Sequence, residues 1–295
     1  MKPVQALLAV ALSVWSFLIC PMENAAAQVA IQSEDYAQAR AAFRTKLLLK
    51  GPAPQKSTPA NVPADVKIVR YAVGDLKLSA WIGLPKNRQT KMPAVLFIHG
   101  GFAFDGSDFA MAKPFLDAGF VVMTPILRGE NGQPGAFTLF FDEVNDVLAA
   151  SDVLRKLDYV DNSRVFICGH SSGGTLALLA GMATPVFKGI ASFGGSLDQA
   201  ALVDGWEKQK IVPFDQSNPK EFELRSPLAY ATSLKSPTRL YVGSQDSFHL
   251  AASRKLAEVA QTKKLDVETL TISGNHYTSV PEAITKSIVF FKSLK

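Results

Sequence analysis

Short apolar and β-branched runs recur from residue 66 to the end of the chain, and helical patterns separate most of them. The runs lie at residues 66–72, 76–84, 94–98, 120–124, 165–168, 190–193, 239–242 and 267–272. Apolar positions at helical spacing mark residues 141–157, 175–182, 250–262 and 281–292. This alternation predicts an α/β fold, with a mostly parallel twisted sheet that helices cover on both faces. Gly74-Asp75 between the first two runs predicts an opening hairpin.

Two segments stand outside this alternation. Residues 28–65 combine a helical pattern over 33–50 with a stretch rich in Pro, Ser and Thr, and so predict an N-terminal helix and linker before a main domain at 66–295. Residues 196–237 are polar, contain proline and are too long for an ordinary connection. They are either a lid that binds substrate or a plain surface loop that its aromatic residues pack down.

The first 27 residues have the pattern of a secretory signal peptide. Lys2 supplies the positive start, residues 6–20 are apolar, and three alanines at 25–27 precede Gln28. The apolar run is shorter than the about 20 residues of a membrane span, and Ile19 before Cys20 argues against a lipid anchor. We therefore expect an exported protein, in the periplasm or the medium, with no stable membrane span after signal cleavage.

Composition narrows the class of protein. The 295 residues are 47% hydrophobic, which suits one large core. After signal cleavage Cys168 is the remaining cysteine, so an intramolecular disulfide is excluded, and its place at the end of an apolar run predicts a core residue. The net charge is +5, but Lys and Arg are dispersed without a basic run interleaved with aromatics. This pattern argues against nucleic acid as a partner.

The residues Gly169-His170-Ser171-Ser172-Gly173 match the G-x-S-x-G pattern of a nucleophile elbow. In such an elbow a sharp turn from strand to helix exposes a serine hydroxyl, and the predicted strand before and helix after this motif provide that context. Ser171 is therefore the predicted nucleophile, against the alternative of a plain glycine-rich turn. Ser172 is excluded from that role because the residue two positions before it is His170, not glycine.

An oxyanion hole needs backbone N–H groups beside the nucleophile. The N–H of Ser172 is one predicted donor, because the residue after the nucleophile fills this role. The second comes from Gly101 or Phe102, in the His-Gly-Gly-Phe loop that begins at His99 after the strand at 94–98. Phe102 and Phe104 are expected either to line the substrate pocket or to pack this loop.

A serine hydroxyl requires a positioned base, and the chain has four histidines. His99 belongs to the oxyanion loop, His170 lies inside the elbow, and His249 lies in or just before a helix. His276 directly follows the last predicted strand and precedes the last helix. It is the predicted base, because it completes the order of serine, acid and histidine along the chain.

The acid that orients this base is expected on the loop after the penultimate strand. Asp246 lies there, after the run at 239–242. Its alternative role is to cap the following helix, and Asp198, which follows another strand, is the alternative acid. The predicted triad is therefore Ser171, Asp246 and His276.

Together these residues resemble the α/β-hydrolases, and among them the catalytic domain of the prolyl oligopeptidase family of serine peptidases. The resemblance spans residues 66–295 and rests on motifs in this order: His99-Gly100-Gly101, Arg128-Gly129, the helix from Asp142 before Asp161 and Arg164, the glycines around Ser171, Ser226-Pro227-Leu228, and the loops of Asp246 and His276. Members that cleave oligopeptides carry a large N-terminal propeller, for which residues 28–65 are too few. The resemblance implies acyl transfer to water on a small ester or short peptide.

Such a reaction proceeds through a covalent acyl-enzyme and requires no metal and no organic cofactor. The competing hypothesis is a non-catalytic binding protein that has kept the hydrolase fold, because a fold alone does not define a function. Intact serine, acid and histidine residues at all three loops favour catalysis over binding.

Overall fold

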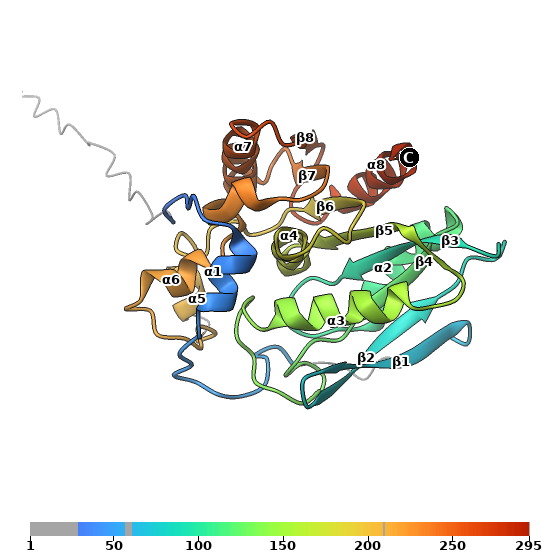
Figure 1. Ribbon diagram of the computed structural model, residues 1–295, viewed down its shortest axis with the longest axis horizontal. Coiled ribbons are helices and arrows are strands. Elements are labelled where there is room, and N and C mark those ends of the chain that lie inside the picture. Colours follow the sequence, from blue (N-terminus) through green and yellow to red (C-terminus); the bar gives the residue numbers. More distant parts are fainter. Residues whose placement is uncertain (1–28, 57–60, 209, 295) are drawn as a thin grey trace, which may run out of the picture.

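The computed structural model describes residues 29–56, 61–208 and 210–294 (Figure 1). The predicted signal peptide at 1–27 lies outside these residues. Within the described ranges, each helix is too short or too polar to cross a lipid bilayer.

An eight-stranded sheet runs through the molecule, in the order β1-β2-β4-β3-β5-β6-β7-β8. β1 pairs antiparallel with β2 and β2 with β4, and the other neighbours are parallel. The predicted hairpin and the mostly parallel sheet are confirmed. The strands are β1 Val66–Val73, β2 Leu76–Gly83, β3 Met92–Ile98, β4 Val121–Pro125, β5 Val160–His170, β6 Gly189–Phe193, β7 Thr238–Gly243 and β8 Val267–Ile272.

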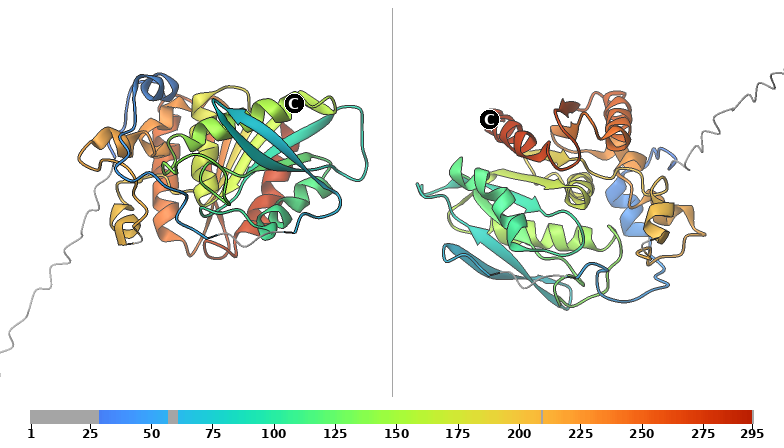
Figure 2. Two further views of the ribbon diagram at one scale, coloured as in Figure 1. Left: turned by 90° about the horizontal axis from the view of Figure 1, so that it is seen from below. Right: turned by 180° about the vertical axis from the view of Figure 1, so that it is seen from behind.

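Helices cover both faces of the sheet (Figures 1 and 2). α3 Glu143–Arg155, α4 Ser172–Ala183 and α7 Ser247–Gln261 contribute to the hydrophobic core on one face. α2 Gly106–Asp117 and α8 Val280–Ser293 contribute to the core on the other. Strand β3 shows why the central strands are apolar without interruption: Leu96 and Ile98 face the first core, whereas Val95 and Phe97 face the second.

Helix α2 was not predicted from the sequence. Its apolar contacts come from Phe109, Ala112 and Phe115, and Pro114 stands inside the helix. The sequence signal for this helix was a capping box at its start. The Asp105 side chain accepts from the backbone N–H of Asp108, and the Asp108 side chain accepts from the backbone N–H of Asp105. At the N-terminus the helix predicted over 33–50 is wrong in length, because α1 is confined to Tyr36–Ala42.

Within the segment at 196–237, the described residues 196–208 and 210–237 contain α5 Val203–Lys208, α6 Pro219–Glu223 and the 3-10 helix η1 Pro227–Ser233. We call residues 29–56 the N-terminal arm. The arm lies against this segment, with a bridge between Leu47 and Phe214 and a hydrogen bond from the Gln32 N–H to the Ala229 carbonyl (2.7 Å). In Figure 1, α1 and α6 lie side by side beyond the end of the sheet.

Candidate active site

The predicted triad residues all follow parallel strands at one edge of the sheet. Ser171 follows β5, Asp246 lies three residues after β7, and His276 lies four residues after β8. Because parallel strands end at the same edge, residues far apart in the sequence meet there. The structure brings Asp246 and His276 into direct contact, and the Ser171 loop adjoins them.

Ser171 occupies a strained backbone conformation, with φ 53° and ψ −120°. A non-glycine residue rarely adopts a positive φ, and such strain concentrates at functional sites. The turn is closed by small neighbours: a Cβ on Gly173 would lie 2.1 Å from the Ile98 carbonyl oxygen, and one on Gly169 would lie 2.5 Å from the Gly173 backbone. The predicted elbow is therefore present, and the glycines on both sides of the serine are sterically required.

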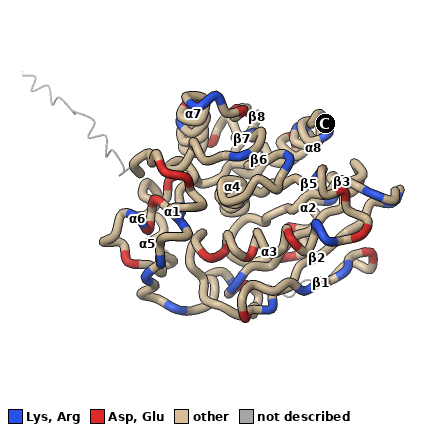
Figure 3. Tube along the Cα trace, in the orientation of Figure 1, with Lys and Arg blue, Asp and Glu red and all other residues tan. Residues whose placement is uncertain are grey.

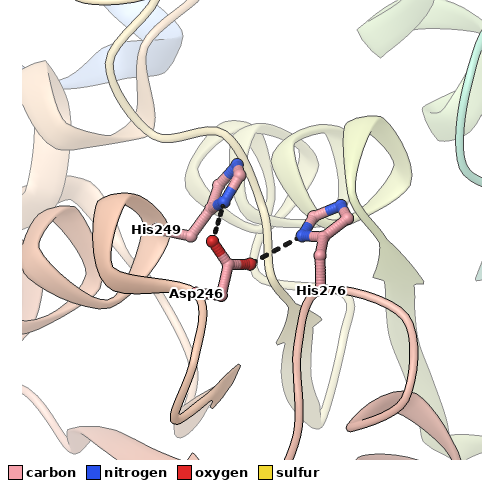
Figure 4. Close-up of side chains that lie close together, drawn as sticks. All are labelled: Asp246, His249 and His276. Carbon is pink, nitrogen blue, oxygen red and sulfur yellow. Dashed lines mark hydrogen bonds and ion pairs between the residues drawn. The ribbon is translucent and has the colours of Figure 1, made fainter.

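His276 and Asp246 are joined by a hydrogen bond of 2.7 Å between Nδ1 and Oδ2 (Figure 4). An ionised carboxylate only accepts, so Nδ1 carries the proton and Nε2 is left as the acceptor nitrogen of the ring. Gly194, which follows β6, lies beneath the imidazole, where an added Cβ would be 3.0 Å from Nδ1. This tautomer is the one that a general base beside a serine requires.

His170 links the elbow to the His276 loop. Its ring lies 4.8 Å from that of His276, and its Nε2 donates to the His276 carbonyl oxygen at 3.0 Å. Burial lowers the pKa of His170 to about 4, and the nearby His276 ring adds to this effect. His170 is therefore neutral at pH 7 and packs on His276 without adding a charge.

The charge on Asp246 is stabilised locally. Partial burial opposes its ionisation, but hydrogen bonds from His249 and His276 outweigh burial and lower the pKa of Asp246. The second donor is His249, whose Nδ1–H donates to Oδ1 of Asp246 at 2.7 Å. This contact was missed in the sequence, where His249 was only placed at the start of a helix.

The oxyanion loop is tied to the elbow and to the N-terminal arm. The Ser172 hydroxyl donates to the Gly101 carbonyl at 2.7 Å, which fixes the loop beside Ser171. The N–H of Phe102 donates to Gln55 Oε1 at 2.9 Å. One of the two predicted alternatives for the second donor is thus engaged by a side chain of the arm, and no motif in the sequence pointed to Gln55.

A pocket of about 450 Å³ opens at Ser171. Aromatic rings form much of its wall: Phe102 packs 5.9 Å from Phe140 and 6.0 Å from Trp206 between ring centroids. Trp206 belongs to α5, so residues 196–237 contribute to the pocket. The lining residues are Gln55, Gly100, Gly101, Phe102, Asp108, Met111, Phe140, His170, Ser171, Ser172, Ser196, Trp206 and Tyr277.

Two alternatives from the sequence receive structural roles instead. Phe104 is buried in the core against Trp81, at 4.9 Å between ring centroids, so its predicted role in lining the pocket is wrong. Asp198, the alternative acid, accepts from the N–H groups of Val29 (3.1 Å) and Ala201 (3.1 Å). It therefore holds the arm and its own loop and does not orient His276.

Asp246, His249 and His276 have potential metal-ligand atoms within 4.8 Å of one another. Both histidine Nδ1 atoms, however, lie 2.7 Å from carboxylate oxygens of Asp246. These are hydrogen-bond distances, so both Nδ1 atoms are engaged as donors and are not free to bind a cation. The arrangement fits a hydrogen-bonded carboxylate with two histidine donors.

The sheet order, the serine elbow and the loops at the carboxyl edge define the α/β-hydrolase fold. The chain belongs to the prolyl oligopeptidase family, whose sequence profile matches residues 107–289. This match includes Ser171, Asp246 and His276, whereas Gln55 and the oxyanion loop precede it.

Individual relatives agree with this assignment. The uncharacterized peptidase YtmA of Bacillus subtilis (strain 168) is 26% identical over 167 residues, which are 51% of this chain and 62% of that protein. An acylaminoacyl peptidase from Pyrococcus horikoshii superposes with a TM-score of 0.63 at 22% identity, covering 77% of this chain and 40% of that one. A puromycin-hydrolyzing peptidase from Mycobacterium tuberculosis gives 0.64 at 24% identity, with coverages of 74% and 37%. The chain thus spans less than two thirds of each of these proteins, and the structural likenesses establish the fold.

Proposed function

We propose that this chain is a serine hydrolase in which Ser171 is the nucleophile, His276 the base and Asp246 the orienting acid. The observation that carries the proposal is the pairing of a strained serine elbow with a histidine whose Nδ1 is bonded to a carboxylate at 2.7 Å. Membership of a family of serine peptidases supports it.

In the proposed reaction, His276 Nε2 takes the Ser171 proton as Oγ forms a bond to the substrate carbonyl carbon. The oxyanion that results is stabilised by the Ser172 N–H and by an N–H of Gly101 or Phe102. His276 then protonates the leaving amine or alcohol, and the carbonyl re-forms as an acyl-enzyme. Water, deprotonated by His276, attacks the acyl carbon and releases the acid product and free Ser171.

The proposed substrates are short peptides or small carboxylic esters. A pocket of about 450 Å³ with Phe102, Phe140 and Trp206 in its wall suits one apolar or aromatic substituent beside the scissile bond. The lining includes one carboxylate, that of Asp108, and no Lys or Arg among the residues that the structure describes. Apolar or cationic substituents are therefore favoured over anionic ones.

The test is covalent labelling of the mature protein by a fluorophosphonate, read by intact mass. We expect one adduct on the wild type and none on Ser171→Ala, while Ser172→Ala keeps an adduct on Ser171 at a reduced rate. Turnover of matched aminoacyl esters and aminoacyl amides then separates esterase from peptidase activity. A folded wild type that forms no adduct would contradict the proposal and favour a binding protein with a hydrolase fold.

We also propose that the protein is exported and that its mature chain begins at Gln28. The support is the charged start, apolar run and alanine triplet in the sequence. Expression of the full chain followed by mass analysis of the periplasmic and medium fractions tests this. A product that retains residues 1–27 in the cell interior would contradict it.

A further inference from the structure

The Asp246 carboxylate accepts hydrogen bonds from two histidines, one on each oxygen. His276 Nδ1 lies 2.7 Å from Oδ2 and His249 Nδ1 lies 2.7 Å from Oδ1, as Figure 4 shows. The three side chains are 20%, 17% and 10% exposed for His276, His249 and Asp246. Water therefore has little access to the carboxylate, and His249 supplies the hydrogen bond to Oδ1 that solvent would otherwise supply.

His249 is itself held in one orientation. The Ser196 hydroxyl lies 3.3 Å from its Nε2, so Ser196 donates to Nε2 while Nδ1 donates to Asp246. The ring also stacks on that of His276, with centroids 4.7 Å apart and planes 28° from parallel. His249 thus contacts both the acid and the base, and it comes from α7 rather than from the loop that carries His276.

We propose that His249 is a positioning residue that fixes the Asp246 carboxylate and the His276 ring for catalysis. This inference rests on the proposed function, because it assigns a support to that triad. Without a donor to Oδ1, the Asp246 carboxylate can rotate about its Cβ–Cγ bond. The hydrogen bond from His276 Nδ1 to the carboxylate is then no longer confined to one geometry. A catalytic group displaced in this way loses rate without losing substrate binding.

Ser196, His249 and Asp246 are hydrogen-bonded in the order serine, histidine, acid, as a catalytic triad is. The surroundings of Ser196, however, differ from those of Ser171. The backbone of Ser196 is fixed by Thr175, whose hydroxyl accepts from the Ser196 N–H and donates to its carbonyl, both at 2.9 Å. Ser196 is 5% exposed. The positive φ belongs to Ser171, which faces the oxyanion loop, and we therefore assign Ser196 the role of fixing the His249 tautomer.

The experiment compares two variants that separate the donor from the ring. His249→Asn keeps an N–H donor at the position of Nδ1, and His249→Phe keeps a ring over His276 without a donor. We expect His249→Phe to lower kcat by roughly 10-fold with KM little changed, and His249→Asn to stay within about 3-fold of wild type, since a hydrogen bond to a charged group has this size. The low-field N–H resonance of His276 should broaden or shift in His249→Phe and persist in His249→Asn.

Thermal unfolding of both variants controls for folding. Equal kcat in folded His249→Phe and wild type would overturn the inference, and so would an equal loss in both variants with the His276 resonance unchanged. A fluorophosphonate adduct on Ser196 in the Ser171→Ala protein would also overturn it, by making Ser196 a nucleophile. Failure of the triad itself is distinguishable, because wild type would then form no adduct at all.

Discussion

His99, a buried charged residue, fixes the start of the oxyanion loop. Its Nδ1 lies 2.9 Å from the Gly100 carbonyl and its Nε2 lies 2.9 Å from Glu130 Oε2. Both partners are acceptors, so both ring nitrogens donate and the ring is an imidazolium. Burial opposes this charge, but Glu130 outweighs burial and raises the pKa of His99 to about 9. The start of the oxyanion loop is therefore anchored by an ion pair.

This ion pair predicts a pH dependence of stability. Because the folded pKa of about 9 lies above the ordinary histidine value of 6.5, the stabilisation is fully present below pH 6.5 and is lost as the pH rises toward 9. The loss is on the order of 3 kcal/mol. Urea unfolding at pH 6.5, 7.5 and 9 measures it. The Glu130→Gln variant should be less stable at pH 6.5 and show a flatter dependence, and the same slope in both proteins would contradict the assignment.

Gln55 gives a second prediction at the level of a single residue. Its Oε1 accepts from the Phe102 N–H and so competes with an oxyanion for that donor. We expect Gln55→Ala to accelerate fluorophosphonate labelling by about 5-fold, the equivalent of one net hydrogen bond. Gln55→Glu should slow labelling, because it places a negative charge beside the loop. Slower labelling of Gln55→Ala would instead mean that Gln55 keeps the loop in shape.

At the level of elements, a buried ion pair joins α6 to the N-terminal arm. The Arg225 guanidinium and the Glu221 carboxylate are both fully buried, 2.6 Å apart. Glu221 also accepts from the Thr45 hydroxyl and the Lys46 N–H, both at 2.7 Å. Arg225 further lies over the ring of Phe214 at 4.0 Å. One ion pair therefore holds the arm, α6 and the start of η1 together.

Removal of one partner should be costly, because it leaves the other charge buried without compensation. We expect Arg225→Met to lower the free energy of unfolding by about 3–5 kcal/mol, and the double variant Arg225→Met, Glu221→Met to recover part of that loss. Denaturant unfolding measures both. Lys113→Ala, which removes an exposed pair with Asp117, is the control and should cost less than about 1 kcal/mol. A double variant less stable than the single one would contradict this account.

The elements that the sequence predicted are those with a regular period. Period-two and buried apolar runs placed all eight strands, and the loops that follow β5, β7 and β8 gave Ser171, Asp246 and His276. Helix α2 was missed because its buried face is small, with Phe109, Ala112 and Phe115, and because Pro114 stands inside the helix. The roles of Gln55 and His249 were not predicted for another reason. Each residue acts through a side-chain contact with a segment distant in the sequence, and spacing along the chain does not encode such contacts.

Across the whole molecule, the site depends on the hydrophobic core that α4 shares with the N-terminal arm and the segment at 196–237. Helix α4 directly follows Ser171 and contains no charged residue, so Figure 3 draws it without blue or red. It is buried from Ser172 to Met182. The helix stands between the sheet and the segment at 196–237, whose Trp206 completes the pocket wall. The arm in turn holds that segment, since the Tyr36 N–H donates to Ser233 Oγ at 3.0 Å.

This chain of contacts predicts that the arm and the pocket unfold together. Tyr36 is fully buried, and its ring packs edge-on against Tyr230 at 5.2 Å. We expect Tyr36→Ala to lower the free energy of unfolding by about 3–5 kcal/mol. In both proteins, fluorophosphonate labelling and the far-UV circular dichroism signal should be lost at the same urea concentration, as one cooperative unit requires. If labelling is lost at a lower urea concentration than the circular dichroism signal, the arm and the segment at 196–237 form a separate, less stable unit. The pocket then folds and unfolds independently of the hydrolase core.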